Sequence, residues 1–448
     1  MATAWVVSRR AVPFRSISRS DIFSRSISTH PEKTQINHPL CISPVDAEPL
    51  HRYRQGGYRP VTLGECLKSG RYKVLHKLGW GGYSTVWVAR DLRLYNIMPL
   101  TLTDKLPVCR DDVYVAVKIY VAEMYNIGQE LDILKKLAFR QPLKHTVHLL
   151  DDFDLKGPNG SHNCLVYELL GPNIPDTIDA YFPGGRLPGK LAKIIAKQSL
   201  IGLNDLHQMN IAHGGKLLHS PSNEYFESFS YNIDLHTRNL AFTIPYDNET
   251  EQQFTEMLRK PEIGHVRRSD GKDLEPGIPR YIVRPTSYWM HSWNSAQSIK
   301  IVDFGGSFLG TTVPQTLHTP LPVRAPEVIF QDHIDYRVDL WSMGCMVWQL
   351  FELFVGQPPF DTFLITPPIL VNQMREMASD DLPERWHKIW ETMKADDSKP
   401  TEGPVPNLQG WLEELYFDSP HSPDLTKEDI ARLGQIIGSL LLFEPSAR

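Results

Sequence analysis

Two short motifs carry residue types suited to binding a nucleoside triphosphate. The first is a glycine-rich turn, residues 78–86, which lies between two segments that alternate like strands. Glycine has no Cβ atom, so backbone amides at such a turn can approach phosphate groups closely. The second is Asp303-Phe304-Gly305, which follows an apolar run at residues 299–302. An Asp at a strand end can hold the magnesium ion that bridges the phosphates, so the two motifs together predict nucleotide chemistry.

Lys118 and Glu130 lie between these motifs. Lys118 falls in a predicted strand, residues 112–120, where its ammonium group would reach the α- and β-phosphates. Glu130 falls on the next segment, residues 122–138, whose apolar period predicts a helix. Both residue types are more often solvated surface side chains. Their order after the glycine-rich turn favours instead an ion pair in which Glu130 holds Lys118 in place.

A loop further along the chain supplies a candidate general base. Asp234 and Asn239 stand just before a predicted strand at residues 240–244. Asp234 would accept the proton of an attacking hydroxyl group and orient that group. Asn239 would hold a second magnesium ion, with Asp303 on the first. The spacing of Asp234 and Asn239 alone is not specific for a catalytic loop. Its position between the glycine-rich turn and Asp303 makes that interpretation stronger.

Features near the end of the chain predict a packed helical region. Glu327 follows Asp303 after a short loop, within an Ala-Pro-Glu sequence. Asp339 opens the most apolar helix, expected at residues 340–354, where an ordinary helix cap would also explain it. A buried carboxylate needs a partner, so we expect an ion pair between Glu327 and Arg448.

The composition limits the class of protein. A chain of 448 residues with 41% hydrophobic content can bury one large core or two smaller ones. Its net charge of −5 gives no sign of direct nucleic-acid binding. No apolar run reaches the length of a membrane span. The five cysteines are scattered without Cys-x-x-Cys spacing, which favours a reducing compartment over a disulfide framework.

The pattern of elements predicts an α+β protein in two parts after a tail and linker at residues 1–57. Strands and one helix occupy residues 58–170, and helices dominate residues 171–448. Two stretches look inserted into the second part, at residues 215–233 and 245–296.

The motifs, in this order, resemble those of a eukaryotic protein kinase over residues 72–448. Within that class they resemble the SR-protein kinases (SRPK) of the CMGC group, of the fungal type. The resemblance rests on a lead-in at residues 55–61, on Lys-Leu-Gly-Trp-Gly in the glycine-rich turn, and on Arg324 before Ala-Pro-Glu. That family also divides its kinase core at the place of residues 245–296. The resemblance implies the bilobal protein kinase fold, with a small β-rich N-lobe and a larger helical C-lobe.

The resemblance also implies a non-specific serine/threonine protein kinase that uses ATP and Mg²⁺. Ser in Arg/Ser-rich splicing proteins would be the substrate, and the enzyme would be a monomer without direct nucleic-acid or membrane partners. The catalytic residues would be Asp234, Lys118, Glu130 and Arg238, and the metal ligands Asn239 and Asp303. The nucleotide would contact Leu78, Gly79, Trp80, Gly81, Gly82, Tyr83, Ser84, Thr85, Val86, Ala116, Lys118, Glu168 and Leu170.

Some positions depart from the family pattern. His236 stands where the family has a Lys that neutralises the transferred phosphoryl group, and we expect Arg238 to supply that charge instead. The change leaves Ser/Thr against Tyr specificity open, and Thr319 favours Ser/Thr by analogy with the family. Gly214 stands where many kinases have an Arg that pairs with a phosphorylated activation loop. We therefore expect activity without phosphorylation of that loop.

Residues 215–233 separate His213 and Gly214 from Asp234. Without them the sequence would continue as His-Gly-Asp-Leu-His-Thr-Arg-Asn, as in a kinase catalytic loop. The insert begins Gly-Lys-Leu, which a 5′ splice-site sequence can encode, so we expect a retained intron or an error in the gene model. The alternative is a real loop that bulges out and leaves Asp234 in place. A true insertion in a loop of such tightly held geometry would reduce activity.

Two other functions stay open at this point. A pseudokinase that binds nucleotide without efficient transfer would also explain His236 and the insert. A small-molecule phosphotransferase would share the His-Gly-Asp-Leu-His…Asn pattern but would lack Ala-Pro-Glu. Phosphate transfer to a protein separates these classes.

The expected substrate and location rest on charge patterns. Arg-rich substrates would favour an acidic groove, although acidic runs are usually solvated faces. The candidate acidic residues are Asp380, Asp381, Glu384, Asp396 and Asp397. The family implies cytoplasm and nucleus. Residues 1–30 are rich in Arg and Ser and poor in acids, so a mitochondrial presequence is the alternative to a disordered basic tail.

Overall fold

The structure, a computed structural model, places residues from Leu40 to Arg448 in one compact unit. The predicted base Asp234, His236 and the insert at residues 215–233 lie outside the described residues, as does the basic tail. The described residues are 40–92, 113–124, 127–139, 143–182, 186–214, 237–244, 251–286, 298–317, 319, 321–345, 360, 365–394, 407–418 and 423–448.

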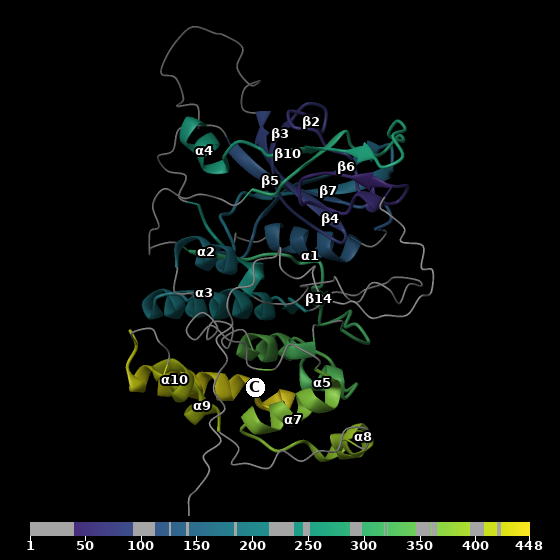
Figure 1. Cartoon of the computed structure of the whole chain (residues 1–448). Coiled ribbons are helices and arrows are strands. Elements are labelled where there is room, and N and C mark those ends of the chain that lie inside the picture. The colour runs from purple at the N-terminus through teal and green to yellow at the C-terminus, as the bar shows by residue number, and fades with distance from the viewer. Residues whose placement is uncertain are drawn as a thin grey trace, which may run out of the picture. The chain divides into compact units, whose positions relative to one another are not determined.

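A six-stranded antiparallel sheet holds the glycine-rich turn and Lys118 (Figure 1). In spatial order its strands are β2 (Cys66–Leu67), β3 (Tyr72–Gly81), β4 (Ser84–Asp91), β5 (Val113–Tyr120), β7 (Gly160–Glu168) and β6 (Leu149–Gly157). Successive side chains of β5 point to opposite faces, as in any strand. Val115 and Val117 are buried in one core, whereas Lys118 and Tyr120 face helix α1 (Gly128–Phe139).

Two short strand pairs lie beyond α1. β9 (Leu240–Phe242) pairs antiparallel with β13 (Ile299–Ile301), with Leu240 opposite Ile301. β8 (Ile211–Ala212) pairs with β14 (Phe308–Leu309). The first pairing puts the residues just before β9 beside those just after β13, so it joins the two predicted metal positions.

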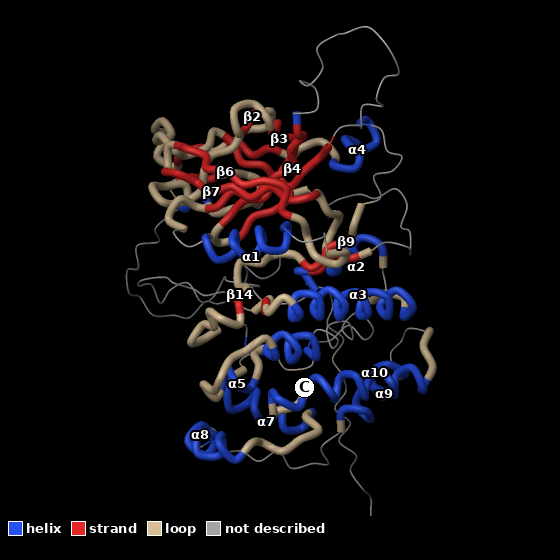
Figure 2. Tube along the Cα trace, turned by 180° about the vertical axis from the view of Figure 1, so that it is seen from behind, coloured by secondary structure: helices blue, strands red, loops and turns tan. Residues whose placement is uncertain are grey.

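Helices form most of the rest of the described chain (Figure 2). Residues 337–345 are helical, as the start of the predicted helix at 340–354 requires, and the rest of that stretch is outside the described residues. None of the helices in the described part of the chain is long and apolar enough to cross a membrane. The named helices are α2 (Ile174–Tyr181), α3 (Gly189–Gln208), α5 (Pro326–Ile329), α7 (Pro367–Met377), α8 (Glu384–Lys394), α9 (Leu408–Phe417) and α10 (Lys427–Leu440), with 3-10 turns at η1 (Leu50–Arg52), η3 (Thr237–Asn239), η4 (Leu321–Val323) and η5 (Pro445–Ala447).

The stretch at residues 245–296 packs against the sheet. Its helix α4 (Glu251–Leu258) lies beside the sheet in Figure 1, and the Phe254 ring stacks on Tyr114 of β5 with ring centroids 3.7 Å apart. Its strands add small pairings at the edge of the unit. They are β10 (Ile263–His265) with β12 (Tyr281–Val283), and β11 (Arg267–Arg268) with β1 (Cys41–Ile42). This stretch was counted with the helical part of the chain, yet its described residues contact the strand-rich part.

Two local expectations differ from the structure. The helix expected from residue 122 begins at Gly128, because Ala122 and Glu123 bond through their amides to the carbonyls of Gly57 and Gly56 instead. The linker expected up to residue 57 is packed over its described residues, where Glu48 accepts hydrogen bonds from the buried Lys77 ammonium and from Tyr53.

Candidate active site

The glycine-rich turn is the connection between β3 and β4. Trp80 pairs with Thr85 and Gly81 with Ser84, which leaves Gly82 and Tyr83 at the tip. A Cβ atom built on Gly81 or Gly82 would meet no protein atom within 4 Å. These two positions therefore have open space around them, as a close approach of phosphate oxygens to the backbone requires.

Lys118 links two predicted partners from distant parts of the chain. Its Nζ lies 3.3 Å from Oε1 of Glu130 and 2.9 Å from Oδ1 of Asp303. The expected Lys118–Glu130 pair is thus confirmed. Burial lowers the pKa of Lys118, but the attraction of Asp303 and Glu130 outweighs burial and raises it overall. The ammonium group therefore stays charged, as binding of phosphates requires.

Two tyrosines also donate hydrogen bonds to the Glu130 carboxylate, and the sequence prediction did not include them. Tyr120 Oη donates to Glu130 Oε2 at 2.6 Å, and Tyr167 Oη donates to Oε1 at 3.4 Å. Burial, followed by the charge of Glu130, raises the pKa of both tyrosines, so both remain donors. The alternation of β5 was a usable signal, because Tyr120 is two residues after Lys118 and must share its face.

Asp303 has a backbone conformation that few residues other than glycine adopt. Its φ of 63° lies in the left-handed region, and such outliers cluster at functional sites. The amide of Val302 donates to the carbonyl of Asn239 at 2.9 Å, so Asn239 and Asp303 lie at the same end of the β9–β13 pair. One carboxylate and one carboxamide suit a divalent cation whose other ligands are phosphate oxygens.

The described residues contain no group of three or more His, Cys, Asp or Glu side chains placed to hold a metal ion by themselves. A site with few protein ligands is what Mg²⁺ uses when it arrives with phosphates. The donor set of Asn239 and Asp303 therefore fits the metal that the sequence predicted.

Asp339 organises the segment that leads to the predicted catalytic loop. Its buried carboxylate accepts hydrogen bonds from the amides of His213 at 2.7 Å and Gly214 at 2.8 Å, and it contacts His207 Nε2 at 2.9 Å. The sequence offered only a helix cap for Asp339. In the structure it instead fixes the backbone that precedes Asp234 in sequence.

The predicted catalytic Arg238 is half exposed. Its Nη1 lies 3.8 Å from Oδ1 of Asp176 on α2, as a loose surface ion pair. Thr319 is buried, its carbonyl accepts from the Arg324 guanidinium at 2.5 and 3.0 Å, and its hydroxyl has no hydrogen-bond partner among the described residues. Asp234, beside which Arg238 would act, lies outside the described residues.

The predicted nucleotide contacts divide into two groups. Leu78 and Ala116 pack in one cluster with Phe254 of α4, close to the turn. The Glu168 carboxylate is bound by Lys300 Nζ at 2.6 and 2.8 Å, and the Thr85 hydroxyl accepts from the Trp87 indole at 3.0 Å. The side chains of these last two residues are therefore engaged within the protein. Leu170 packs against the large core.

The ion pair expected between Glu327 and Arg448 is confirmed. The guanidinium donates to the two carboxylate oxygens at 2.7 and 2.8 Å, and both side chains are fully buried. Arg448 also lies over the Trp341 ring, 5.1 Å from its centroid. The pair joins α5 to the last residues of the chain.

The acidic residues proposed as a substrate groove do not act alike. The Asp380 carboxylate accepts from the amides of Phe443 at 2.7 Å and Glu444 at 2.9 Å, so it has a structural role. Asp381 and Glu384 are exposed, and Asp396 and Asp397 lie outside the described residues.

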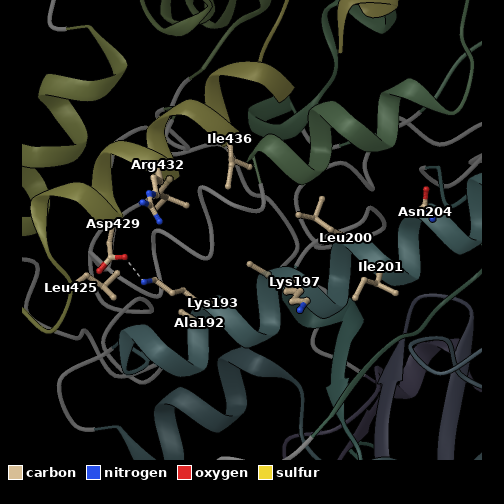
Figure 3. Close-up of a pocket in the computed structure, with 12 residues that line it drawn as sticks. Ala192, Lys193, Lys197, Leu200, Ile201, Asn204, Leu425, Asp429, Arg432 and Ile436 are labelled. Carbon is tan, nitrogen blue, oxygen red and sulfur yellow. Dashed lines mark hydrogen bonds and ion pairs between the residues drawn. The ribbon is translucent and has the colours of Figure 1, made fainter.

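A cavity of about 570 Å³ lies elsewhere, between α3 and α10 (Figure 3). Apolar residues such as Leu200 and Leu433 line it, and Lys193 pairs with Asp429 at its rim at 2.6 Å. None of the predicted nucleotide or metal residues lines this cavity, so it is separate from the candidate active site.

Comparisons with known proteins identify protein kinases as similar to this chain. The protein kinase domain model matches residues 290–415. A serine/threonine protein kinase of Aspergillus fumigatus is 29% identical over 358 residues, which cover 78% of this chain and 75% of the relative. The SRPK of Physarum polycephalum is 29% identical over 316 residues, covering 66% and 64%. The kinase SKY1 of Saccharomyces cerevisiae is 36% identical over 163 residues, covering 36% and 21%.

The domain match and these relatives support a serine/threonine protein kinase, a class that uses ATP with a divalent metal ion. Among such kinases the similarity is to SRPK-like members, since the matches include the SRPK of Physarum polycephalum, SKY1 and an SRSF protein kinase. The comparisons give no support to a small-molecule phosphotransferase.

Proposed function

We propose that this protein transfers the γ-phosphoryl group of ATP to Ser residues of Arg/Ser-rich splicing proteins, within a bilobal kinase fold. The observation that carries the proposal is the contact of Lys118 with both Glu130 and Asp303. A charged lysine, its positioning carboxylate and a metal-binding carboxylate are the parts that phosphoryl transfer needs in one place.

Each residue then has one task. Lys118 attracts the α- and β-phosphates, and Glu130 fixes its position. Asp303 and Asn239 would hold Mg²⁺, which neutralises phosphate charge when bound. Asp234 orients the substrate hydroxyl and takes its proton, and Arg238 supplies the positive charge that His236 does not.

The substrate class rests on similarity and on charge. One relative is named SRSF protein kinase 3, of Homo sapiens, with 34% identity over 163 residues. The exposed Asp381 and Glu384 at the start of α8 would attract arginine side chains of the substrate. We propose protein substrates of this kind and a monomeric enzyme with no nucleic-acid or membrane partner.

The test is transfer of labelled phosphate from ATP and Mg²⁺ to Arg-Ser, Arg-Thr and Arg-Tyr peptides. The intact chain is compared with a form that lacks residues 215–233, and Asp234→Asn is the blank in each. We expect label on the Arg-Ser peptide. Transfer by the shortened form alone would show that the insert is foreign to the active protein. Nucleotide binding without transfer by either form would establish the pseudokinase alternative.

We also propose residence in the cytoplasm and nucleus. The alternative location is the mitochondrion, if the tail at residues 1–30 acts as a presequence. Imaging the full chain with a C-terminal fluorescent tag, beside a form that lacks residues 1–30, distinguishes the two. Mitochondrial signal that depends on the tail would overturn the proposal.

A further inference from the structure

We propose that Tyr58 is a positioning residue for the glycine-rich turn, and that it ties this turn to the segment between Lys118 and Glu130. The proposal rests on the proposed function, because the turn is where we place the nucleotide phosphates. It gives a role to residues 55–61, which precede the strands of the sheet and include none of the proposed catalytic residues.

The contact with the turn is a single hydrogen bond. Tyr58 Oη donates to the carbonyl of Gly81 at 2.7 Å, directly beside Gly82 and Tyr83 at the tip. The ring of Tyr58 is only 1% exposed, so it cannot swing away without opening the cluster around it. A Cβ atom built on Gly81 would meet no protein atom within 4 Å, so the hydrogen bond to its carbonyl restrains a position that is otherwise open.

The residues before Tyr58 bind the connection from β5 to α1. The carbonyls of Gly56 and Gly57 accept from the amides of Glu123 at 2.6 Å and Ala122 at 3.2 Å. Arg52 Nη2 also pairs with Glu123 Oε1 at 3.0 Å. We call this stretch, residues 52–58, the brace. It contacts the glycine-rich turn at one end and the Lys118–Glu130 connection at the other.

The glycines of the motif are required by the path of the brace. A Cβ atom on Gly57 would lie 1.8 Å from the carbonyl oxygen of Arg52, which no side chain can tolerate. Gly56 has a φ of 81°, in the region that favours glycine. The tight turn that these two residues permit delivers the Tyr58 ring to Gly81.

The inserted stretch at residues 245–296 supports the brace from outside. Asn159 is buried, and its Nδ2 donates to the carbonyls of Tyr58 at 2.7 Å and Gly277 at 2.9 Å. Val266 and Ile282 pack in the same cluster as Tyr58. The stretch at residues 245–296 therefore helps to hold the brace in position.

The hydroxyl of Tyr58 remains a donor at every pH at which a kinase is assayed. Burial, assisted by the charges of Glu48 and Glu123 and opposed by Arg52, raises its pKa to about 12. The effect of removing the hydroxyl should therefore be the same at pH 6.5 and pH 9.

The experiment compares Tyr58→Phe with the parent chain, in the form that transfers phosphate. We expect amide hydrogen exchange in residues 79–86 without nucleotide to be about two- to tenfold faster, the range that one neutral hydrogen bond gives. We expect the KM for ATP to rise by a similar factor, with kcat and the peptide KM nearly unchanged.

Tyr281→Phe is the matched control. Its hydroxyl also makes one hydrogen bond to backbone, from the amide of Leu63 at 2.9 Å, but it has no contact with the turn in the described structure. It should leave both readouts at the parent value. Exchange in α10 reports global unfolding and should not change in either variant.

The outcomes separate the two proposals. Unchanged exchange at residues 79–86 in Tyr58→Phe would overturn the positioning role, whatever the enzyme does. Faster exchange in a protein that binds no ATP would support the contact and overturn the proposed function. Faster exchange with an unchanged KM for ATP would overturn the claim that the bond matters for the nucleotide.

Discussion

At Lys118, burial and charge act on the pKa in opposite directions, and charge prevails. We predict that Lys118→Met lowers kcat by about 10²–10³, because a preorganised charge that meets the transferred phosphates is lost. The protein should still fold, since Tyr120 and Tyr167 continue to bind Glu130. Phosphate transfer and thermal melting measure the two effects.

Lys135→Met is the control for this change. Lys135 is a lysine on the exposed side of α1, and it pairs with Asp152 at 2.8 Å with 55% of its side chain exposed. It should retain parent activity. A Lys118→Met enzyme with more than a tenth of parent kcat would exclude the role assigned to Lys118.

Gly214 occupies a position that no other residue can take without strain. Its φ is 64°, and a Cβ atom would lie 2.6 Å from the carbonyl oxygen of Gly306. We predict that Gly214→Ala destabilises the fold by about 1–3 kcal/mol. Denaturant unfolding measures this, with Gly128→Ala as the control, because a Cβ atom on Gly128 meets nothing within 4 Å. Equal stability of both variants would contradict the prediction.

Among the elements, α5 depends on one buried ion pair. Removing one partner of such a pair leaves an uncompensated charge, so Arg448→Met should destabilise the protein by about 3–5 kcal/mol. The exposed pair of Arg432 and Glu428, 2.6 Å apart, is the comparison, and Arg432→Met should lose about 1 kcal/mol or less. Chemical denaturation measures both. Similar losses in the two variants would show that the buried Glu327–Arg448 pair stabilises the protein no more than an exposed pair does.

Helix α4 packs on the sheet through three buried side chains, Phe254, Met257 and Leu258. Phe254 is buried and stacks on Tyr114, so Phe254→Ala should destabilise the protein by about 3–5 kcal/mol. Limited proteolysis would then cut within residues 245–296 before other sites. A variant that melts like the parent would mean that α4 is held elsewhere.

The sequence predicted the strands around the site because their periods are local. β5, β9 and β13 lie within about two residues of the ranges expected for them. The start of α1 was placed too early, because Ala122 and Glu123 are held by the brace, which is far away in sequence. The docking of residues 245–296 on the sheet was not predictable for the same reason.

The candidate site divides in the same way. Lys118, Glu130, Asn239 and Asp303 were found because each follows a local motif. Tyr167 and the Lys300–Glu168 pair were missed, since only the folded chain brings them together. Asp339 was found as a residue, but its hydrogen bonds to His213 and Gly214 required the structure.

At the scale of the whole molecule, activity should not depend on phosphorylation of the chain. The absence of an Arg at position 214 removes the usual partner of a phosphorylated activation loop. We predict that complete dephosphorylation changes peptide phosphorylation by less than about twofold, because no ion pair to a phosphate is needed. The measurement is initial rate before and after phosphatase treatment, with mass spectrometry to verify removal. Loss of activity that returns on rephosphorylation would refute this.

β9 and β13 pair at the two ends of the stretch at residues 245–296, with Leu240 opposite Ile301, and we call this paired base the neck. The entropy lost in closing a flexible loop grows only with the logarithm of its length, about 0.6 kcal/mol for each doubling. Residues could therefore be added to this loop at little entropic cost, provided that its packed residues such as Phe254 are kept. Asn239 and Asp303 stand at the neck, so their separation is independent of how many residues the loop contains.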